Sequence, residues 1–221
     1  MRNRFDRQLQ LLDEQLIHMG ELCEGAIAKA TEALQKGDVQ QAKAIMAADE
    51  EIDQMEKDIE RLCLKLLLQQ QPVAKDLRRI SAALKMITDM ERIGDQTSDI
   101  AEIVISSSQM TDVDIKKIGT MAAAASKMVR ESVTAYVQKD LELAKKVMQE
   151  DDTVDGYFNE IRDEMISYIR AEKGHNGEKI FDLIMVTKYL ERIGDHATNI
   201  AEWVEFSITG VHRGNVSVKE D

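Results

Sequence analysis

The chain has 221 residues, of which 43% are hydrophobic, 32% are charged and only 4% are aromatic, with a single proline. This composition is typical of an all-α protein of one or two domains with an aliphatic core. The net charge of −12 argues against nucleic acid as a partner. The sequence contains no run of 18 apolar residues and no apolar signal-peptide core in its first ten residues, so we expect a cytoplasmic protein.

The first predicted helix is defined by apolar residues that recur three or four positions apart. They are Phe5, Leu9, Leu12, Leu16, Met19, Cys23, Ile27, Ala30 and Leu34. This spacing is typical of the buried seam of a long helix in a bundle. Gly37 is expected to stop the helix and Asp38 to cap the next one. Cys23 and Cys63 both fall at apolar positions, which favours two reduced, buried thiols.

The second predicted helix runs from about Val39 to Gln70. Its seam consists of Ala42, Ile45, Ile52, Ile59, Cys63 and Leu66. Asp49 interrupts this seam at a core-like position, as does Glu56, and Asp53 follows Asp49 by one turn. Pro72 is expected to end the helix and to suit the first turn of the third, which is predicted over about 73–107.

A polar stretch over 106–112 separates this part of the chain from the rest, and we place the boundary between two halves there. Three more helices are predicted after it, over about 113–138, from about 141 to 170, and up to about 208, with a linker over 172–177 before the last. The predicted organisation is a first three-helix bundle over 1–108, a second over 109–210, and a polar tail over 211–221.

Internal duplication dominates the sequence. Residues 91–102 read ERIGDQTSDIAE and residues 191–202 read ERIGDHATNIAE, and eight of the twelve positions are identical. Residues 37–53 likewise align without gaps to residues 139–155. Such self-similarity indicates that one unit occurs twice. We therefore predict two tandem antiparallel three-helix bundles related by an internal pseudo-twofold axis.

Pairs of acidic residues four positions apart recur in both halves. Spacing of i, i+4 places the two carboxylates of a pair on one face of a helix, and here that face lies at the edge of the apolar stripe. Two carboxylates about 4 Å apart repel by roughly 4 kcal/mol at an effective dielectric constant of about 20, so a counter-charge is expected. An all-oxygen cage suits hard cations such as Mg²⁺, Mn²⁺ or iron. The pairs are Asp49/Asp53 and Glu91/Asp95 in the first half, and Asp151/Asp155 and Glu191/Asp195 in the second.

We predict that Asp53 and Asp95 share one cation and that Asp155 and Asp195 share another. The alternative, which stays open here, is that these carboxylates form a solvated acidic face without a bound metal. The glycines Gly94 and Gly194 inside the repeated stretch indicate close packing against another helix or a ligand.

Other metal chemistries find little support in the sequence. A ferritin-like di-iron site needs Glu-x-x-His on two helices, and the single such match, Glu172–His175, lies in the glycine-bearing linker. His196 is expected at the surface, because it is about 100° around the helix from Asp195 and Gln96 takes its place in the first half.

Taken together, the repeated motifs, the N-terminal Arg-x-x-Phe-Asp-x-x-Leu at 2–9, Met19-Gly20 and Gln-Pro-Val-Ala-Lys-Asp-Leu-Arg at 71–78 resemble the PhoU family. The family consists of accessory proteins of bacterial phosphate-specific transport. The resemblance extends to about Phe206 and implies two three-helix bundles whose acidic motifs bind multinuclear metal clusters. Carried over, the ligands are the four pairs above with Asp99 as a further candidate, and Asn199, its uncharged counterpart, implies a different second site.

The resemblance also implies a function. A family member is expected to be a non-enzymatic negative regulator of phosphate uptake and of the phosphate regulon, with iron, zinc, manganese or magnesium as its metal. Expected partners are a sensor histidine kinase, the ATP-binding component of the phosphate ABC transporter and a second copy in a homodimer, with at most peripheral contact to the membrane. Arg92 and Arg192 either partly neutralise the acidic stripe or bind a partner. A carboxylate-bridged metalloenzyme and a metal-free helical scaffold are the alternatives.

Overall fold

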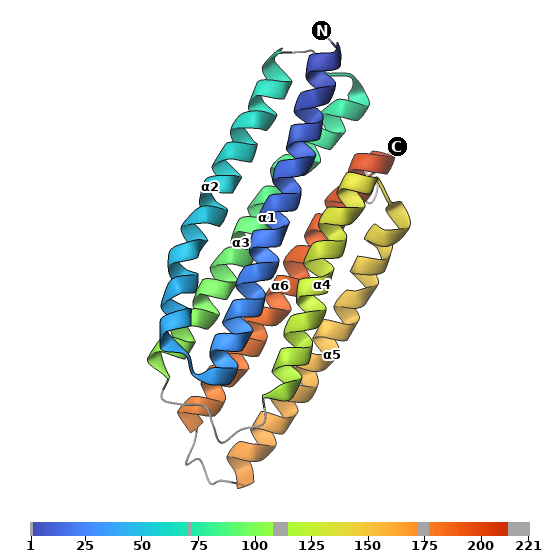
Figure 1. Cartoon of the computed structure of the whole chain (residues 1–221). Coiled ribbons are helices and arrows are strands. Elements are labelled where there is room, and N and C mark those ends of the chain that lie inside the picture. The colour runs from blue at the N-terminus through green and yellow to red at the C-terminus, as the bar shows by residue number, and fades with distance from the viewer. Residues whose placement is uncertain (1, 70–71, 108–114, 172–176, 212–221) are drawn as a thin grey trace, which may run out of the picture.

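The computed structural model describes residues 2–69, 72–107, 115–171 and 177–211, and within these ranges the chain forms six α-helices and no strand (Figure 1). The first three are α1 (Arg2–Lys36), α2 (Val39–Gln69) and α3 (Ala74–Ser106). The second three are α4 (Lys116–Gln138), α5 (Leu141–Ala171) and α6 (Gly177–Thr209).

The six helices form two three-helix bundles that lie side by side. Helices α1, α2 and α3 pack on one another, and so do α4, α5 and α6. Between the bundles, α1 packs on α4 and α3 packs on α6, while α2 and α5 lie at the two outer edges (Figure 1). Each interface helix therefore meets its own counterpart, as in an isologous twofold interface. The arrangement confirms the predicted tandem bundles.

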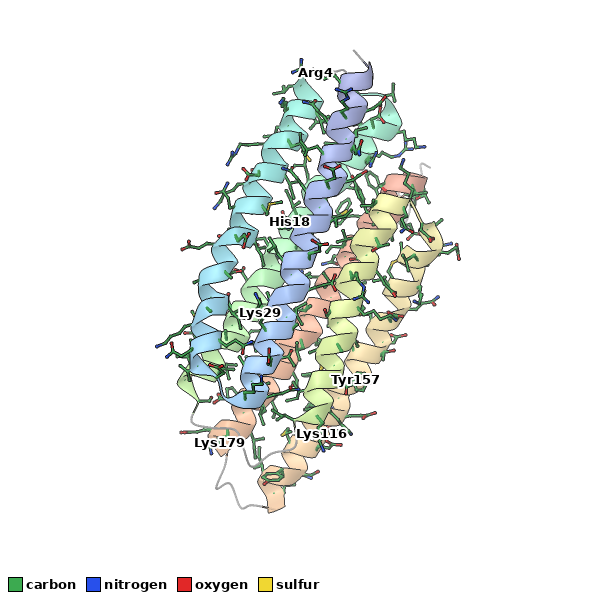
Figure 2. The ribbon with its side chains drawn as sticks, viewed as in Figure 1. Arg4, His18, Lys29, Lys116, Tyr157 and Lys179 are labelled. Atoms are coloured by element: carbon green, nitrogen blue, oxygen red, sulfur yellow. The ribbon has the colours of Figure 1, made fainter. Side chains whose placement is uncertain are left out.

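Apolar side chains form one core that continues through both bundles. Every residue of the predicted α1 and α2 seams is buried, and Cys23 and Cys63 are buried free thiols, as predicted. Charged and polar side chains cover the outer faces of the helices, where His18 of α1, for example, is 54% exposed (Figure 2). No helix in the described ranges combines the length and the apolar character needed to cross a membrane.

The sharp turns between antiparallel helices have the predicted chemistry. Gly37 adopts a left-handed conformation with φ of 62°. The Asp38 carboxylate then accepts hydrogen bonds at 3.0 Å from the backbone N–H groups of Gln40 and Gln41, which caps α2. In the second bundle Lys139 has φ of 57°, and Asp140 accepts a hydrogen bond from the Leu143 N–H. These turns bring α2 back along α1 and α5 back along α4.

Helix boundaries differ from the sequence prediction at two places. Pro72 precedes the first turn of α3 instead of lying in it, because Val73 is the extended N-cap residue with φ of −69° and ψ of 160°. Gly177, assigned to the linker from its sequence, is the first residue of α6. The predictions that fall on 70–71, 108–114, 172–176 and 212–221 lie outside the described residues.

Candidate metal-binding site

Helices α2 and α3 approach closely at the acidic pairs of the first half, Asp49/Asp53 and Glu91/Asp95, which we call the first cluster; the pairs Asp151/Asp155 and Glu191/Asp195 form the second cluster. Gly94 of α3 is buried opposite Asp49 of α2. A Cβ atom added to Gly94 would lie 2.5 Å from the Asp49 Oδ1 atom and 3.1 Å from the Ile52 Cδ1 atom. The absence of a side chain at Gly94 therefore lets the two helices bring their carboxylates together, which confirms the close packing predicted from the repeated glycine.

The two oxygen atoms of Asp49 have different surroundings. Oδ2 accepts a hydrogen bond of 2.9 Å from the Ser98 hydroxyl of α3. Oδ1 is buried and has no hydrogen-bond partner among the described residues. A buried carboxylate oxygen without a donor is costly. An oxygen atom in this state fits a bound cation or a proton.

Burial and repulsion between neighbouring carboxylates raise the pKa values of the first cluster. Burial raises the pKa of Asp49 above its usual range, and the charges of Asp95, Asp53 and Asp99 raise it further. The pKa of Glu91 is also raised by burial and then by Asp95, Glu56 and Asp53. The carboxylates from α2 and α3 are thus close enough to oppose one another's ionisation. Glu56, which we did not predict as a ligand, belongs to this group.

Asp99 lies on the part of α3 that faces the second bundle. Burial raises the pKa of Asp99, Asp95 and Glu102 raise it further, and Arg192 of α6 opposes this rise. The nearby Tyr189 of α6 likewise has a raised pKa, first from burial and then from the Asp99 charge. Arg192 is exposed and acts on Asp99 across the α3–α6 interface, so it contributes to neutralising the acidic stripe.

The second cluster repeats this arrangement between α5 and α6. Burial and the charges of Asp195 and Asp155 raise the pKa of Asp151 to about 6. The pKa of Asp195 is raised by burial and by Glu191. A Cβ atom on Gly194 would lie 3.4 Å from the Asp151 Oδ1 atom, a looser fit than at Gly94.

The prediction for His196 is wrong. Its side chain is buried, with 7% of the residue exposed, and its Nδ1 atom lies 2.9 Å from Oδ1 of Asp89 in the first bundle. The Asn199 amide donates to the same oxygen at 3.1 Å. Helix α6 packs on α3, α4 and α5, so little of its circumference faces solvent. The predicted ligand Asn199 is therefore held at the junction between the bundles.

Carboxylate oxygens are suitable donors for a hard cation, and the orphaned Oδ1 of Asp49 supports that fit. In their present conformations, however, no three acidic, histidine or cysteine side chains in the described ranges form a set that could hold one ion. The shared cations predicted for each half accordingly stay predictions. The Glu172–His175 pair lies outside the described residues.

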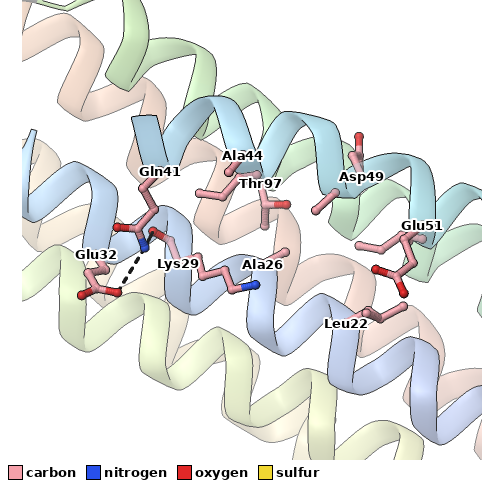
Figure 3. Close-up of a pocket in the computed structure, with 12 residues that line it drawn as sticks. Leu22, Ala26, Lys29, Glu32, Gln41, Ala44, Asp49, Glu51 and Thr97 are labelled. Carbon is pink, nitrogen blue, oxygen red and sulfur yellow. Dashed lines mark hydrogen bonds between the residues drawn. The ribbon is translucent and has the colours of Figure 1, made fainter. Parts of the chain in front are cut away.

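A groove of about 370 Å³ leads to the first cluster from the α1 side. Figure 3 shows Asp49 on its α2 wall, opposite Leu22 and Ala26 of α1, with Thr97 of α3 also lining it. At its other end the Gln41 amide donates to the Lys29 carbonyl and to the Glu32 carboxylate, which joins α2 to α1 (Figure 3). The half-buried Asp49 thus borders both this groove and the contact between α2 and α3.

Alanine substitutions should show how tightly the helices are packed at the two glycines. We expect Gly94→Ala to lower the free energy of unfolding by about 1–3 kcal/mol, because the new methyl group overpacks against Asp49 and Ile52. Gly194→Ala should cost less, since its nearest contact is 3.2 Å from Val154 and the gain in helix propensity offsets part of it.

Gly25→Ala is the matched control, because nothing lies within 4 Å of the added atom. It should stabilise the protein by about 0.5–1 kcal/mol. Urea unfolding of the three variants measures this order, and equal effects at Gly94 and Gly25 would contradict the close approach.

Comparison with known proteins agrees with this architecture. The family model described as the PhoU domain matches the chain twice, at residues 16–104 and 118–204. The chain is 36% identical to the phosphate-specific transport system accessory protein PhoU homolog of Clostridium acetobutylicum, over 95% of this chain and 96% of that one. It is 34% identical to the homolog from Pseudomonas aeruginosa, over 99% of this chain and 92% of the relative.

Two solved structures share the fold. The crystal structure of PhoU from Pseudomonas aeruginosa aligns with a TM-score of 0.87 at 33% identity, covering 94% of this chain and all (100%) of that one. The phosphate transport system regulatory protein PhoU from Streptococcus pneumoniae also aligns with a TM-score of 0.87, at 25% identity and covering 94% and 98% of the two chains.

Proposed function

The chain belongs to the PhoU family, and we propose that it is a non-enzymatic negative regulator of phosphate uptake and of the phosphate regulon. Relatives that match nearly its whole length are accessory proteins of phosphate-specific transport. In this proposal the protein couples the ATP-binding component of the transporter to a sensor histidine kinase and works as a homodimer. The observation that carries the proposal is the duplicated acidic cluster within a fold shared over the full chain.

We propose further that each cluster binds divalent or trivalent cations such as iron, zinc, manganese or magnesium. Asp49, Asp53, Glu91 and Asp95 would hold them in the first bundle, and Asp151, Asp155, Glu191 and Asp195 in the second, with Asp99 and Asn199 as additional candidates. A bound cation supplies the positive charge that offsets the repulsion between these carboxylates. The raised pKa values of Asp49 and Asp151 support this, because burial and neighbouring carboxylates disfavour the ionised forms that a bound cation would stabilise.

The helices explain how metal binding would serve regulation. The two ligand pairs of each half lie on different helices, α2 and α3 or α5 and α6, so neutralising them fixes one helix against the other. A fixed pair of helices presents a pre-organised outer surface to a partner. Arg92 and Arg192 are exposed next to the clusters and are the residues proposed to contact that partner.

A deletion strain tests the regulatory role. Loss of the protein should leave phosphate-starvation genes switched on in abundant phosphate, because the kinase would no longer be held in its inhibited state. Reporter expression in high phosphate, with complementation by the intact gene, measures this. Normal repression in the deletion strain would contradict the proposal.

Paired variants separate metal binding from partner binding. Asp95→Ala with Asp195→Ala should lower metal content and weaken binding to the kinase's cytoplasmic domain by about tenfold or more, equivalent to about 1.4 kcal/mol. Arg92→Ala with Arg192→Ala should weaken kinase binding while leaving metal content and fold intact. If the aspartate variant stays folded, loses its metal and still binds the kinase like wild type, the metal does not organise the binding surface. Turnover of phosphate esters or dioxygen by metal-loaded protein would instead favour the metalloenzyme alternative.

A further inference from the structure

The two acidic clusters differ at one pair of equivalent positions. Helices α2 and α5 align at an offset of 102 residues and the repeated motifs at an offset of 100, so Glu56 corresponds to Phe158 and Thr88 corresponds to Lys188. In the first half, the Thr88 hydroxyl donates to the Glu56 carboxylate at 3.4 Å. In the second half, the Lys188 ammonium lies 5.5 Å from the centre of the Phe158 ring. An ammonium over an aromatic ring thus replaces a hydroxyl beside a carboxylate.

Lys188 is engaged with the acidic cluster itself. Its Nζ atom donates to Oε2 of Glu191 at 2.5 Å, and the Glu191 side chain is only 14% exposed. Lys188 also opposes the rise in the pKa of Asp195, which burial and Glu191 cause. The face of the Phe158 ring attracts the ammonium in addition. An ion pair with Glu191 and a cation–π contact with Phe158 therefore hold Lys188 beside the carboxylates that would bind a metal cation in the second cluster.

Among the described residues, no cation contacts a carboxylate of the first cluster as Lys188 contacts Glu191. Thr88 is neutral, and Glu56 adds to the repulsion on Glu91. Counting Glu56 and Asp99, the first cluster has six carboxylates, whereas the second has four carboxylates and one ammonium, with neutral residues at Phe158 and Asn199. Arg92 and Arg192 are exposed and act on Glu91 and Asp99 of the first cluster, but neither forms a direct ion pair with these carboxylates in the described structure, as Lys188 does with Glu191.

We propose that Lys188, seated over Phe158, is a built-in counter-cation that weakens divalent-cation binding at the second cluster, so that the first cluster loads preferentially. The inference rests on the proposed metal binding and adds that the two halves are functionally unequal. A divalent cation at the second cluster must compete with Lys188 for Glu191 and bind beside a like charge. At the first cluster it meets carboxylates that no ammonium contacts in the described structure, and it relieves their repulsion.

Titration with Mn²⁺ alone measures the affinity of each cluster separately and so tests the expected difference between them. Asp53→Asn with Asp95→Asn disables the first cluster and reports the second; Asp155→Asn with Asp195→Asn does the reverse. We expect Mn²⁺ to bind the second cluster at least about tenfold more weakly, the order expected for one unit charge at intermediate dielectric constant. Lys188→Thr should tighten the second cluster by about tenfold, and Thr88→Lys should weaken the first by a similar factor.

Lys117→Thr is the matched control for loss of one positive charge in the second bundle, because Lys117 pairs with Glu160 and Glu164 on the outer surface. It should leave Mn²⁺ affinity within about twofold. Unchanged second-cluster affinity in Lys188→Thr, with Mn²⁺ bound, would overturn the inference and leave metal binding intact. Failure of both single-cluster proteins to bind Mn²⁺ would overturn the proposed metal function and the inference with it.

Thermal unfolding of the metal-free protein gives a second measurement that needs no bound ion. Lys188→Thr should lower the melting temperature, because the second cluster loses its counter-charge, and Thr88→Lys should raise it. Added Mn²⁺ should then stabilise Lys188→Thr more than wild type. If Lys188→Thr does not fold, Lys188→Gln and Thr88→Lys answer the same question. A metal-free Thr88→Lys protein that melts below wild type would contradict the role given to the ammonium.

Discussion

Metal-free protein should unfold at a lower temperature at about pH 7.5 than at about pH 5, and Mn²⁺ should remove the difference. The carboxyl groups responsible have pKa values raised in the folded state, and they include Asp49, Glu91, Asp99, Asp151 and Asp195. A raised carboxyl pKa means that the folded state holds its proton to higher pH than the unfolded state does. Stability is therefore lost as the pH rises from the unfolded pKa through the folded one.

Asp151 sets the size of the expected effect. Its pKa moves from 3.8 to about 6 on folding, and one pKa unit corresponds to about 1.4 kcal/mol. Somewhat less than half of this loss falls between pH 5 and pH 7.5, because the unfolded-state carboxyl is already ionised at pH 5. Since the side chain is only partly buried, solvent screening reduces the contribution within the window to about 0.5–1 kcal/mol. The other four groups act in the same direction. For a protein of this size the melting temperature should fall by about 2–4 °C between the two pH values.

The chosen pH window lies above the range in which salt-bridged carboxyls titrate. Salt-bridged carboxyls such as Glu150, whose pKa is lowered by Lys127 and Lys146, change stability only below about pH 4.5. Asp151→Asn should flatten the pH dependence, and Glu150→Gln is the control that should not. Differential scanning calorimetry after chelator treatment measures all three proteins. Equal melting temperatures at both pH values would show that the carboxylates do not oppose one another.

Much of the fold follows from local patterns in the sequence. The seam from Phe5 to Leu34 fixes the buried face of α1, and Gly37 with Asp38 fixes the turn into α2. These signals need only the helical period and the chemistry of helix ends. The duplication then implies that each half repeats the same packing, and the structure confirms it. Pro72 marks the start of α3 only approximately, because the N-cap residue is Val73.

The candidate site was predictable only in part. The acidic pairs and Gly94 are repeated, so they could be found by comparing the halves. Residues that distinguish the halves, such as Thr88 and Lys188, carry no repeated pattern, so identity between the halves does not reveal them. His196 was misplaced for another reason: the contact of α3 with α6 depends on how two bundles dock, and no local period encodes that.

The junction between the bundles gives the second large expected effect. Asp89 of α3 accepts hydrogen bonds from His196 and Asn199 of α6, and its side chain is only 14% exposed. Asp89→Ala removes the acceptor and leaves the imidazole of His196 without this partner in a buried place, whereas the amide of Asn199 is exposed and can bond to water. Removing one partner of such a network costs more than the hydrogen bonds contribute, because the remaining buried group stays desolvated.

We expect Asp89→Ala to lower the free energy of unfolding by about 2–4 kcal/mol, measured by urea denaturation. Asp89→Asn keeps one acceptor oxygen and should cost less. Double substitution with His196→Gln, which installs the residue found at Gln96, isolates the coupling between the pair, expected at about 1–3 kcal/mol. Additive effects would mean that Asp89 and His196 do not support each other. Helices α3 and α6 also carry one acidic pair of each cluster. A loosened junction between them should let the two halves unfold in separate steps. A single sharp transition in Asp89→Ala would show that the remaining apolar contacts, between α3 and α6 and between α1 and α4, are enough to hold the bundles together.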